Sequence, residues 1–395
     1  MAYDDICVLR HILVITATVP GNWQEPWKQT AFRAYAYILD VLYLFCMITK
    51  VSYTIRVTDM KQDYLDDFFD CLIIVSLVLE RMMIRRKSKE LIQFFQKMDE
   101  FPKPGPHVKN LIKIYKKQAR HVLMIFGVLI VSCLLEAVMN FLVNYCDSNV
   151  VKDEERICKL FVMETDLPSA LVRSPLYGLL FICNLIQLTL MGFLGFLSFI
   201  MIPVLVIKLS CQFRITADSF EKRLKVGVYK TRSVESSING EEDLESVIKQ
   251  HQYTLEVATM MTKTFHTIIL LKLVFLVLPI IVVAYCLSQF PIGSFDFLRF
   301  TALFLVLLIK LATFCFFGEQ LADHSLMVYR AVYMNQWYRM DKEDKKMLLI
   351  VATRAIRPAR LEVWPHFVPV SFETFVNVCQ FSYSVYSVLM MVSSK

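Results

Sequence analysis

The stretch from Ser174 to Ile207 contains no charged residue, and it constrains the fold of this chain more than any other feature. A helix needs roughly 20 mostly apolar residues to cross the hydrocarbon core of a bilayer, and six other segments meet or approach that length. The chain is also 56% hydrophobic, which is more than one soluble core normally buries. The sequence therefore predicts an all-α, polytopic membrane protein with seven transmembrane helices, at Ala34–Ile55, Phe68–Met83, His121–Tyr145, Ser174–Ile207, Thr264–Phe290, Phe300–Phe317 and Phe367–Val392.

The fourth predicted span is unusually long. At a rise of 1.5 Å per residue it would extend about 51 Å, which exceeds the thickness of one membrane. Two spans hinged at Gly192 and Gly195 are the alternative, but each would be too short to cross comfortably. We expect one helix that continues past the cytoplasmic face, where Pro203 is a candidate bend.

The distribution of lysine and arginine gives the orientation, because positive residues are retained on the cytoplasmic side. Of the 43 such residues, 32 lie in the N-terminal segment and in the connections between spans two and three, four and five, and six and seven. The other side of the membrane has 8. This asymmetry predicts a cytoplasmic N-terminus and, after seven crossings, an extracellular C-terminus.

Most of the 11 cysteines lie in apolar segments, where a thiol behaves as a small hydrophobic group. Cys146 and Cys158 differ, because both fall in the acidic outer connection between spans three and four. That side is the oxidising one, so these two residues are the candidates for a disulfide. Two unpaired thiols are the alternative.

Motifs of enzyme chemistry are missing from the sequence. It has no glycine-rich phosphate loop, nucleophile elbow, paired CxxC or HExxH, which predicts no enzyme, no cofactor and no metal site. The basic runs border predicted helices on the inner leaflet, so they indicate membrane lipid as the neighbour and not nucleic acid.

Five charged residues lie at membrane depth: Asp40, Asp70, Glu136, Lys272 and Lys310. Such residues often mark functional sites. Several lie within two turns of a helix end and can reach the interface, which favours a structural role for them. Glu136 and Lys310 are the deepest and are the best candidates for a functional role.

The C-terminal third has a distinctive order of features. Gly318 follows an aromatic cluster, Ser325 comes next, and a block from Tyr333 to Tyr338 precedes the amphipathic MLLIVATRAIRP and the terminal SYSVYSVL. In this order and spacing the chain resembles the insect odorant receptor family. The chain lacks the TYxxxxxQF ending of the related gustatory receptors, and its connection of roughly 50 residues between spans four and five is shorter than that of the olfactory coreceptor. It looks like an odorant-specific tuning subunit.

The resemblance implies an odorant receptor subunit in the plasma membrane of olfactory sensory neurons. With the olfactory coreceptor, such a subunit forms a heterotetrameric, ligand-gated, non-selective cation channel that binds a small volatile odorant. On this plan residues 31–320 hold helices one to six and a pocket in their outer half, 321–366 form a cytoplasmic anchor, and 367–395 form the pore-lining helix.

Two sets of site residues follow from that plan. The pocket should be apolar with few polar groups, and its candidates are Phe69, Ile73, Val138, Phe141, Leu142, Tyr145, Tyr177, Leu180, Phe181, Asn184, Phe300, Leu303 and Phe304. Each is more often core packing than a ligand contact. The pore or gate candidates are Ser384, Val385, Val388, Met391 and Val392, with an ordinary lipid-facing stripe as the alternative.

The anchor segment contains apolar residues at helical spacing, at Met347, Leu348, Val351 and Ala355. They predict a buried face, either against neighbouring subunits or against the projecting fourth helix of the same chain.

Other classes of protein remain as alternatives. A gustatory-receptor-like channel shares the same plan. A G-protein-coupled receptor requires the opposite orientation, and no DRY or NPxxY signature is present. A secondary transporter would explain Glu136 and Lys310, but no inverted repeat is visible.

Overall fold

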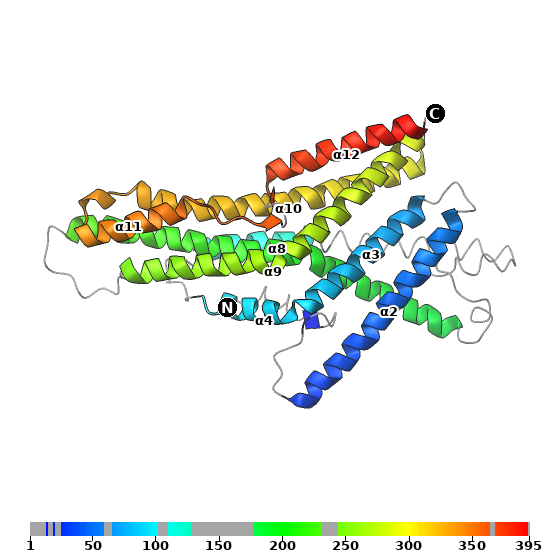
Figure 1. The fold of residues 1–395 in the computed structure, drawn as a ribbon, viewed down its shortest axis with the longest axis horizontal. Coiled ribbons are helices and arrows are strands. Elements are labelled where there is room, and N and C mark those ends of the chain that lie inside the picture. The colour runs from blue at the N-terminus through cyan, green and yellow to red at the C-terminus, as the bar shows by residue number, and fades with distance from the viewer. Residues whose placement is uncertain are drawn as a thin grey trace.

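The structure of the protein is a computed structural model that describes residues 13–14, 19, 25–58, 65–101, 110–125, 127, 177–230, 244–363 and 368–393. Helices make up nearly all of these residues (Figure 1). The predicted all-α class is confirmed for this part of the chain. Most of the third predicted span, and the connection that follows it, lie outside the described residues.

Three helices come first in the described part. α2 (Pro26–Thr58) starts with a proline, whose fixed φ suits the first position of a helix. α3 (Leu65–Arg86) leads through Lys87 into the short amphipathic α4 (Ser88–Asp99). The Lys87 ammonium donates to the Thr264 carbonyl oxygen at 2.9 Å, which fixes the α3–α4 corner against α9.

The fourth predicted span lies in one continuous helix, α8 (Tyr177–Lys230), with Pro203 inside it. The preference for one long helix over two hinged spans is therefore confirmed. Its 54 residues extend about 80 Å, far more than a bilayer core requires. In Figure 1, the later part of α8 runs beside α9 and α10, whereas its first turns diverge from them toward α2.

α9 (Leu244–Gln289) and α10 (Phe295–Tyr333) are joined by a five-residue connection, Phe290 to Ser294. Gly293 adopts φ 91°, a left-handed conformation that favours glycine. Ser294 then caps α10, because its side-chain oxygen accepts from the Phe297 backbone N–H at 3.1 Å. The turn reverses the chain, so α9 and α10 are antiparallel neighbours.

The chain then folds back on α10. After a 3-10 turn, η3 (Trp337–Arg339), α11 (Lys342–Ala355) returns along α10. The Ser325 hydroxyl of α10 donates to the Ala322 carbonyl and accepts from the Ala359 N–H at 2.9 Å, which ties the segment after α11 to α10.

Two short strands lead into the last helix. β1 (Glu362–Val363) pairs antiparallel with β2 (Val368–Pro369), and α12 (Phe372–Ser393) follows. Figure 1 shows α12 along α9 and α10, at the end of the molecule opposite to α11.

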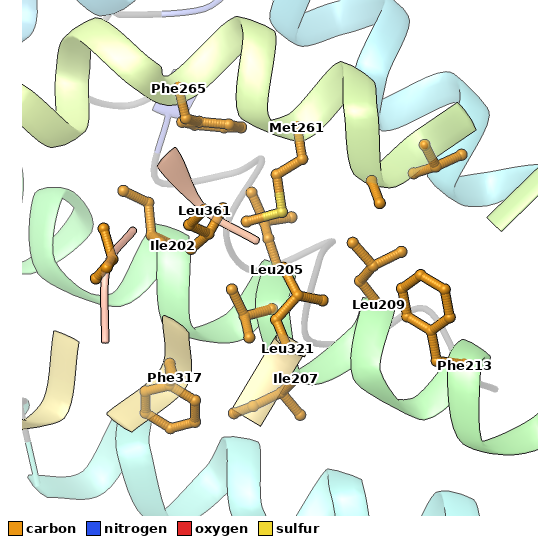
Figure 2. Packing of buried hydrophobic residues seen from close by; sticks show 14 of the residues in the cluster. Ile202, Leu205, Ile207, Leu209, Phe213, Met261, Phe265, Phe317, Leu321 and Leu361 are labelled. Carbon is orange, nitrogen blue, oxygen red and sulfur yellow. The ribbon is translucent and has the colours of Figure 1, made fainter. Parts of the chain in front are cut away.

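The main core lies between α8, α9 and α10 (Figure 2). Leu205 and Phe213 of α8, Phe265 of α9 and Leu321 of α10 are all at most 1% exposed. The α8 segment from Met201 to Ser210 is buried at every position except Lys208, because neighbours cover the helix on all sides. A helix that is apolar all round is expected in such a position.

The anchor helix α11 buries three of its four predicted residues, Leu348, Val351 and Ala355, within this chain, and Met347 is half-buried against the same core. Its main partner is α10 and not the projecting fourth helix, which corrects one of the two predicted arrangements. The opposite face of α11 leaves Leu349 and Ile350 60% and 70% exposed.

Five helices of the described part are long and apolar enough to cross a membrane: Pro26–Ile55, Thr189–Leu224, Leu244–Gln289, Phe297–Arg339 and Phe372–Val392. They overlap predicted spans one, four, five, six and seven. α3 coincides with the second predicted span. A multi-pass membrane protein is therefore supported.

His251 is buried in the part of α9 that precedes the predicted span starting at Thr264. It is 3% exposed, and neither ring nitrogen has a hydrogen-bond partner among the described residues. The Phe220 ring of α8 meets it edge-on at 6.2 Å. Burial, together with the charge of Arg354, lowers the pKa of His251 to about 4.

We therefore expect acid to destabilise the packing of α9 against α8. Between pH 6.5 and 4 the unfolded chain binds a proton at His251 that the folded chain excludes, so stability is complete above pH 6.5 and falls as the pH drops. The loss at pH 4 is about 3 kcal/mol by this linkage. Thermal unfolding of the solubilised protein across that range measures it. A His251→Phe variant with the same pH dependence as the wild type would contradict the assignment.

Candidate functional site

The pocket candidates on α10 line the start of that helix. Phe300 is 4% exposed and stacks on Phe290, the residue directly after α9, with ring centroids 5.3 Å apart and planes 15° from parallel. Leu303 and Phe304 are half-buried against the main core. Phe300 therefore has an aromatic partner within the chain, whereas Leu303 and Phe304 are partly open.

The remaining pocket candidates are distributed over α3, α8 and the third predicted span. Ile73 of α3 is 38% exposed. Phe69 lies on α3, and Tyr177, Leu180, Phe181 and Asn184 lie on the first turns of α8, with the backbone alone described. Val138, Phe141, Leu142 and Tyr145 lie outside the described residues. Because α8 packs against both α3 and α10, the described candidates are on adjoining helices, and a shared pocket stays a prediction.

The gate candidates occupy the uncovered face of α12. Val388, Met391 and Val392 are 57%, 65% and 68% exposed, Ser384 is exposed, and Val385 is half-buried. The opposite face packs on α9 and α10, where Thr374 and Ser382 are buried and the Ser288 hydroxyl of α9 contacts the Met390 sulfur at 3.2 Å. Among the residues that the structure describes, none covers this first face, which is open to lipid or to another subunit.

The candidate disulfide residues, Cys146 and Cys158, lie outside the described residues. Among those described, no group of histidine, cysteine and acidic side chains is arranged to hold a metal ion.

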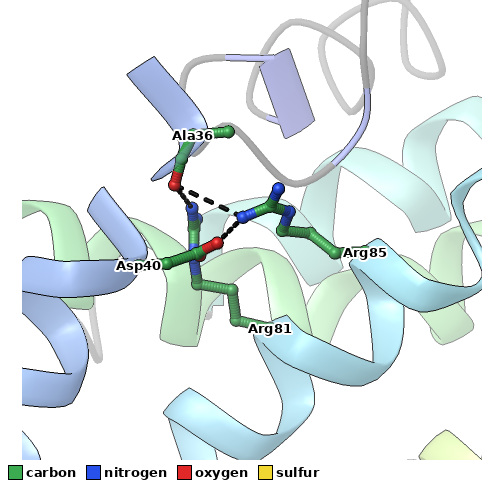
Figure 3. A network of polar contacts seen from close by, with 4 residues as sticks. All are labelled: Ala36, Asp40, Arg81 and Arg85. Carbon is green, nitrogen blue, oxygen red and sulfur yellow. Dashed lines mark hydrogen bonds and ion pairs between the residues drawn. The ribbon is translucent and has the colours of Figure 1, made fainter. Parts of the chain in front are cut away.

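The Asp40 carboxylate, which lies at membrane depth, pairs with two arginines of α3 (Figure 3). Its carboxylate accepts from the Arg81 Nε at 2.9 Å and also pairs with Arg85. Both guanidinium groups reach the Ala36 carbonyl oxygen, at 3.5 and 3.3 Å. Arg81 also lies over the Tyr43 ring, 4.9 Å from its centroid. This group fastens α2 to α3.

A second ion pair lies deeper between helices. The Lys272 ammonium of α9 donates to the Glu80 carboxylate of α3 at 3.0 Å, and the two side chains are 5% and 6% exposed. Sequence reasoning singled out Lys272 but missed Glu80 and Arg81. The signal that could have found them is an acid next to a base, Glu80 and Arg81, inside an apolar segment. Two other predicted spans carry the opposite charges, Lys272 and Asp40.

Comparisons with known proteins agree with this architecture. The family model described as 7tm odorant receptor matches residues 64–383. Putative odorant receptor 92a of Drosophila melanogaster is 23% identical over 149 residues, or 37% of this chain and 35% of the relative. Odorant receptor 45a of the same species is 28% identical over 130 residues, or 32% of this chain and 34% of the relative. These matched stretches span about a third of each relative's length.

The fold of a solved structure matches nearly the whole chain. The olfactory receptor OR5 of Machilis hrabei in complex with eugenol has a TM-score of 0.77, with 14% identity over 99% of both chains. A second structure of the same receptor has a TM-score of 0.76, with 17% identity over 98% of this chain and 97% of that chain. At such identities the likeness concerns the fold alone. The family model covers most of this chain, which therefore belongs to the 7tm odorant receptor family.

Proposed function

We propose that this chain is the odorant-binding subunit of a ligand-gated, non-selective cation channel that it forms with olfactory coreceptor subunits in the plasma membrane of olfactory sensory neurons. The family match across residues 64–383 carries the proposal. It is supported by the likeness of the whole fold to a receptor solved with eugenol, a small volatile molecule. A gustatory-receptor-like channel and a G-protein-coupled receptor are disfavoured by the same match.

The proposed topology has seven spans, a cytoplasmic N-terminus and an extracellular C-terminus. The lysine and arginine distribution supports this orientation. The extension of α8, α9 and α10 well beyond a bilayer's thickness supports the anchor at residues 321–366. A C-terminal epitope tag should be reachable by antibody on intact cells, whereas an N-terminal tag should require permeabilisation. The reverse pattern would exclude this topology.

The proposed odorant pocket lies among α3, the third predicted span, α8 and the start of α10. An apolar cavity suits volatile ligands, because they offer shape and few hydrogen-bonding groups. Tyr145, Tyr177 and Asn184 are the proposed donors to an ester, aldehyde or alcohol oxygen. The stacked pair of Phe290 and Phe300 would form a fixed wall beside it.

The proposed pore is lined by α12. Its uncovered face supports this assignment, because a ring of Val388 and Val392 from several subunits would form an apolar constriction that excludes water when closed. Residues 367–395 would then be the moving part of the channel.

We expect Val388→Ser to raise the current without odorant, because a hydroxyl lowers the cost of wetting the constriction. Val392→Ser should act in the same direction. Whole-cell recordings from cells that also express the coreceptor measure this odorant-free current, or leak, and its inhibition by a channel blocker. Val376→Ser, nearer the start of α12, is the matched control at a valine that is 49% exposed and should leave the leak unchanged. Unchanged leak in both valine variants would argue against a gate at this level.

The experiment that tests the function is current recording from cells that express this chain, the coreceptor, or both, during exposure to a panel of volatile compounds. We expect an odorant-evoked cation current from the pair that is absent with this chain alone. No response from the pair to any compound would count against the proposal.

A further inference from the structure

Four helices meet at one group of side chains, which we name the inner polar cluster: the buried Glu80 of α3 and Lys272 of α9, and the half-buried Phe199 of α8 and Lys310 of α10. Lys272 and Glu80 form the ion pair at 3.0 Å. The Phe199 ring lies beneath both ammonium groups, with its centroid 5.2 Å from Lys272 Nζ and 4.5 Å from Lys310 Nζ. One aromatic ring thus links the ion pair to the second lysine.

All four residues lie at a similar depth. With a rise of 1.5 Å per residue, Glu80, Lys272 and Lys310 are each within about 12 Å of the predicted cytoplasmic end of their spans. Phe199 lies at the same level, because its ring contacts both lysines. α3, α8 and α10 run toward the cytoplasm in the proposed topology and α9 runs away from it, so the four positions coincide only in that antiparallel arrangement. Charges at such depth are costly, and proteins keep them mainly where they serve a function.

The connections of the cluster distinguish it from ordinary packing. α3, α8 and α10 carry the described pocket candidates, and α12 packs mainly on α9 and α10. Lys272 joins α9 directly to α3, and the Phe199 ring joins α8 to both α9 and α10. These side chains therefore connect the helices of the proposed pocket to both helices that support α12.

We propose that the inner polar cluster couples odorant binding to the gate by holding the resting arrangement of α9 and α10 relative to α3 and α8. This role rests on the proposed function. Odorant binding that shifts α3 or α8 separates the Glu80 and Lys272 side chains or moves the shared ring, and α9 and α10 then release α12 toward the open state. The four residues are positioning residues, because they act through the helices and touch neither odorant nor permeating ion.

A buried ion pair suits this task. Its members lose much of their interaction when the geometry departs from the bonded one, so the pair favours one helix arrangement sharply. A ligand can shift such an equilibrium by the difference between its affinities for the two arrangements, typically a factor of 5 to 150. Removing the pair should move the channel in the same direction as odorant does.

The test compares Glu80→Gln, Phe199→Leu and the charge-swapped pair Glu80→Lys with Lys272→Glu, each with the coreceptor. We expect Glu80→Gln to raise the current without odorant and to lower the half-activating odorant concentration about tenfold. Phe199→Leu keeps the ion pair and should produce a smaller shift, about threefold. The swapped pair should restore the wild-type values, because it re-forms the ion pair in reverse. Currents are compared at equal surface amounts of the tagged chain.

Asp40→Asn is the matched control, because it weakens another ion pair at membrane depth. That pair joins α2 to α3 and involves no residue of α9 or α10. It should leave the half-activating concentration within twofold of the wild type. Values within twofold for both Glu80→Gln and Phe199→Leu would overturn the coupling role, and so would an equal shift in Asp40→Asn. If Glu80→Gln fails to reach the surface, Phe199→Leu decides. Absence of any wild-type current would overturn the proposed function, and the coupling role with it.

Discussion

Replacing Gly318 by alanine should separate the start of α12 from α10 and abolish most channel activity. A Cβ at this position would lie 2.1 Å from the Val370 carbonyl oxygen and 2.9 Å from the Val370 carbonyl carbon. These are backbone atoms held by the Val370 N–H, which donates to the Leu361 carbonyl oxygen at 2.8 Å. No rotamer change relieves such a contact, so the expected destabilisation is about 3 kcal/mol.

Gly195→Ala is the matched control for Gly318→Ala. It also lies inside a helix, but its Cβ would meet only a Leu77 methyl carbon at 3.6 Å, an ordinary contact. Alanine is the better helix former, so this variant should be neutral or stabilised by up to about 1 kcal/mol. Thermal unfolding of the solubilised protein and surface labelling measure both variants. Equal behaviour of the two would show that the approach of α10 to Val370 is not tight in the protein.

Removing the Asp40 carboxylate should loosen the attachment of α2. Asp40→Ala leaves Arg81, 1% exposed, without its ionic partner, and breaking a buried pair on one side costs about 3 kcal/mol. The loss is concentrated on α2 because this helix has a small core cluster of its own with α3 and one turn of α8, around Tyr43, Ile74 and Met191. We expect increased proteolysis near α2 and reduced surface delivery.

Arg85→Met is the control for Asp40→Ala. It removes the second cation from the same carboxylate, but the Arg85 side chain is 26% exposed and the buried Arg81 keeps its partner. The expected loss is below about 1 kcal/mol. A loss as large as that of Asp40→Ala would show that the pairing with Arg81 is not what fastens α2.

The positions of the described helices along the chain were predictable because their signals are local. An uncharged run predicted α8 as one rod, and the distribution of lysine and arginine predicted an orientation from counts along the chain. The Tyr333 to Tyr338 block and SYSVYSVL led to the correct family for the same reason, since they are short patterns in a fixed order.

The partners of individual side chains were not predictable, because they depend on contacts between distant segments. Met347, Leu348, Val351 and Ala355 indicated a buried face on α11, but not that α10 would cover it. Glu80 was not singled out from the sequence, because only the packing of α9 places Lys272 beside it. The approach of Gly318 to Val370 likewise depends on the strand pair before α12. Strands of two residues are too short to be predicted from a sequence pattern.

The measurement that tests the central claim most directly is the rank order of odorants, recorded as concentration–response curves from the coreceptor paired with wild type or with a pocket variant of this chain. Leu303→Ala and Tyr177→Phe are suitable, because they enlarge the proposed pocket or remove a proposed hydrogen-bond donor. If this chain binds the odorant, the order should change, with Tyr177→Phe losing sensitivity to oxygen-containing volatiles and keeping it for hydrocarbons. An identical order for wild type and both variants would place the odorant site outside the proposed pocket and contradict the account.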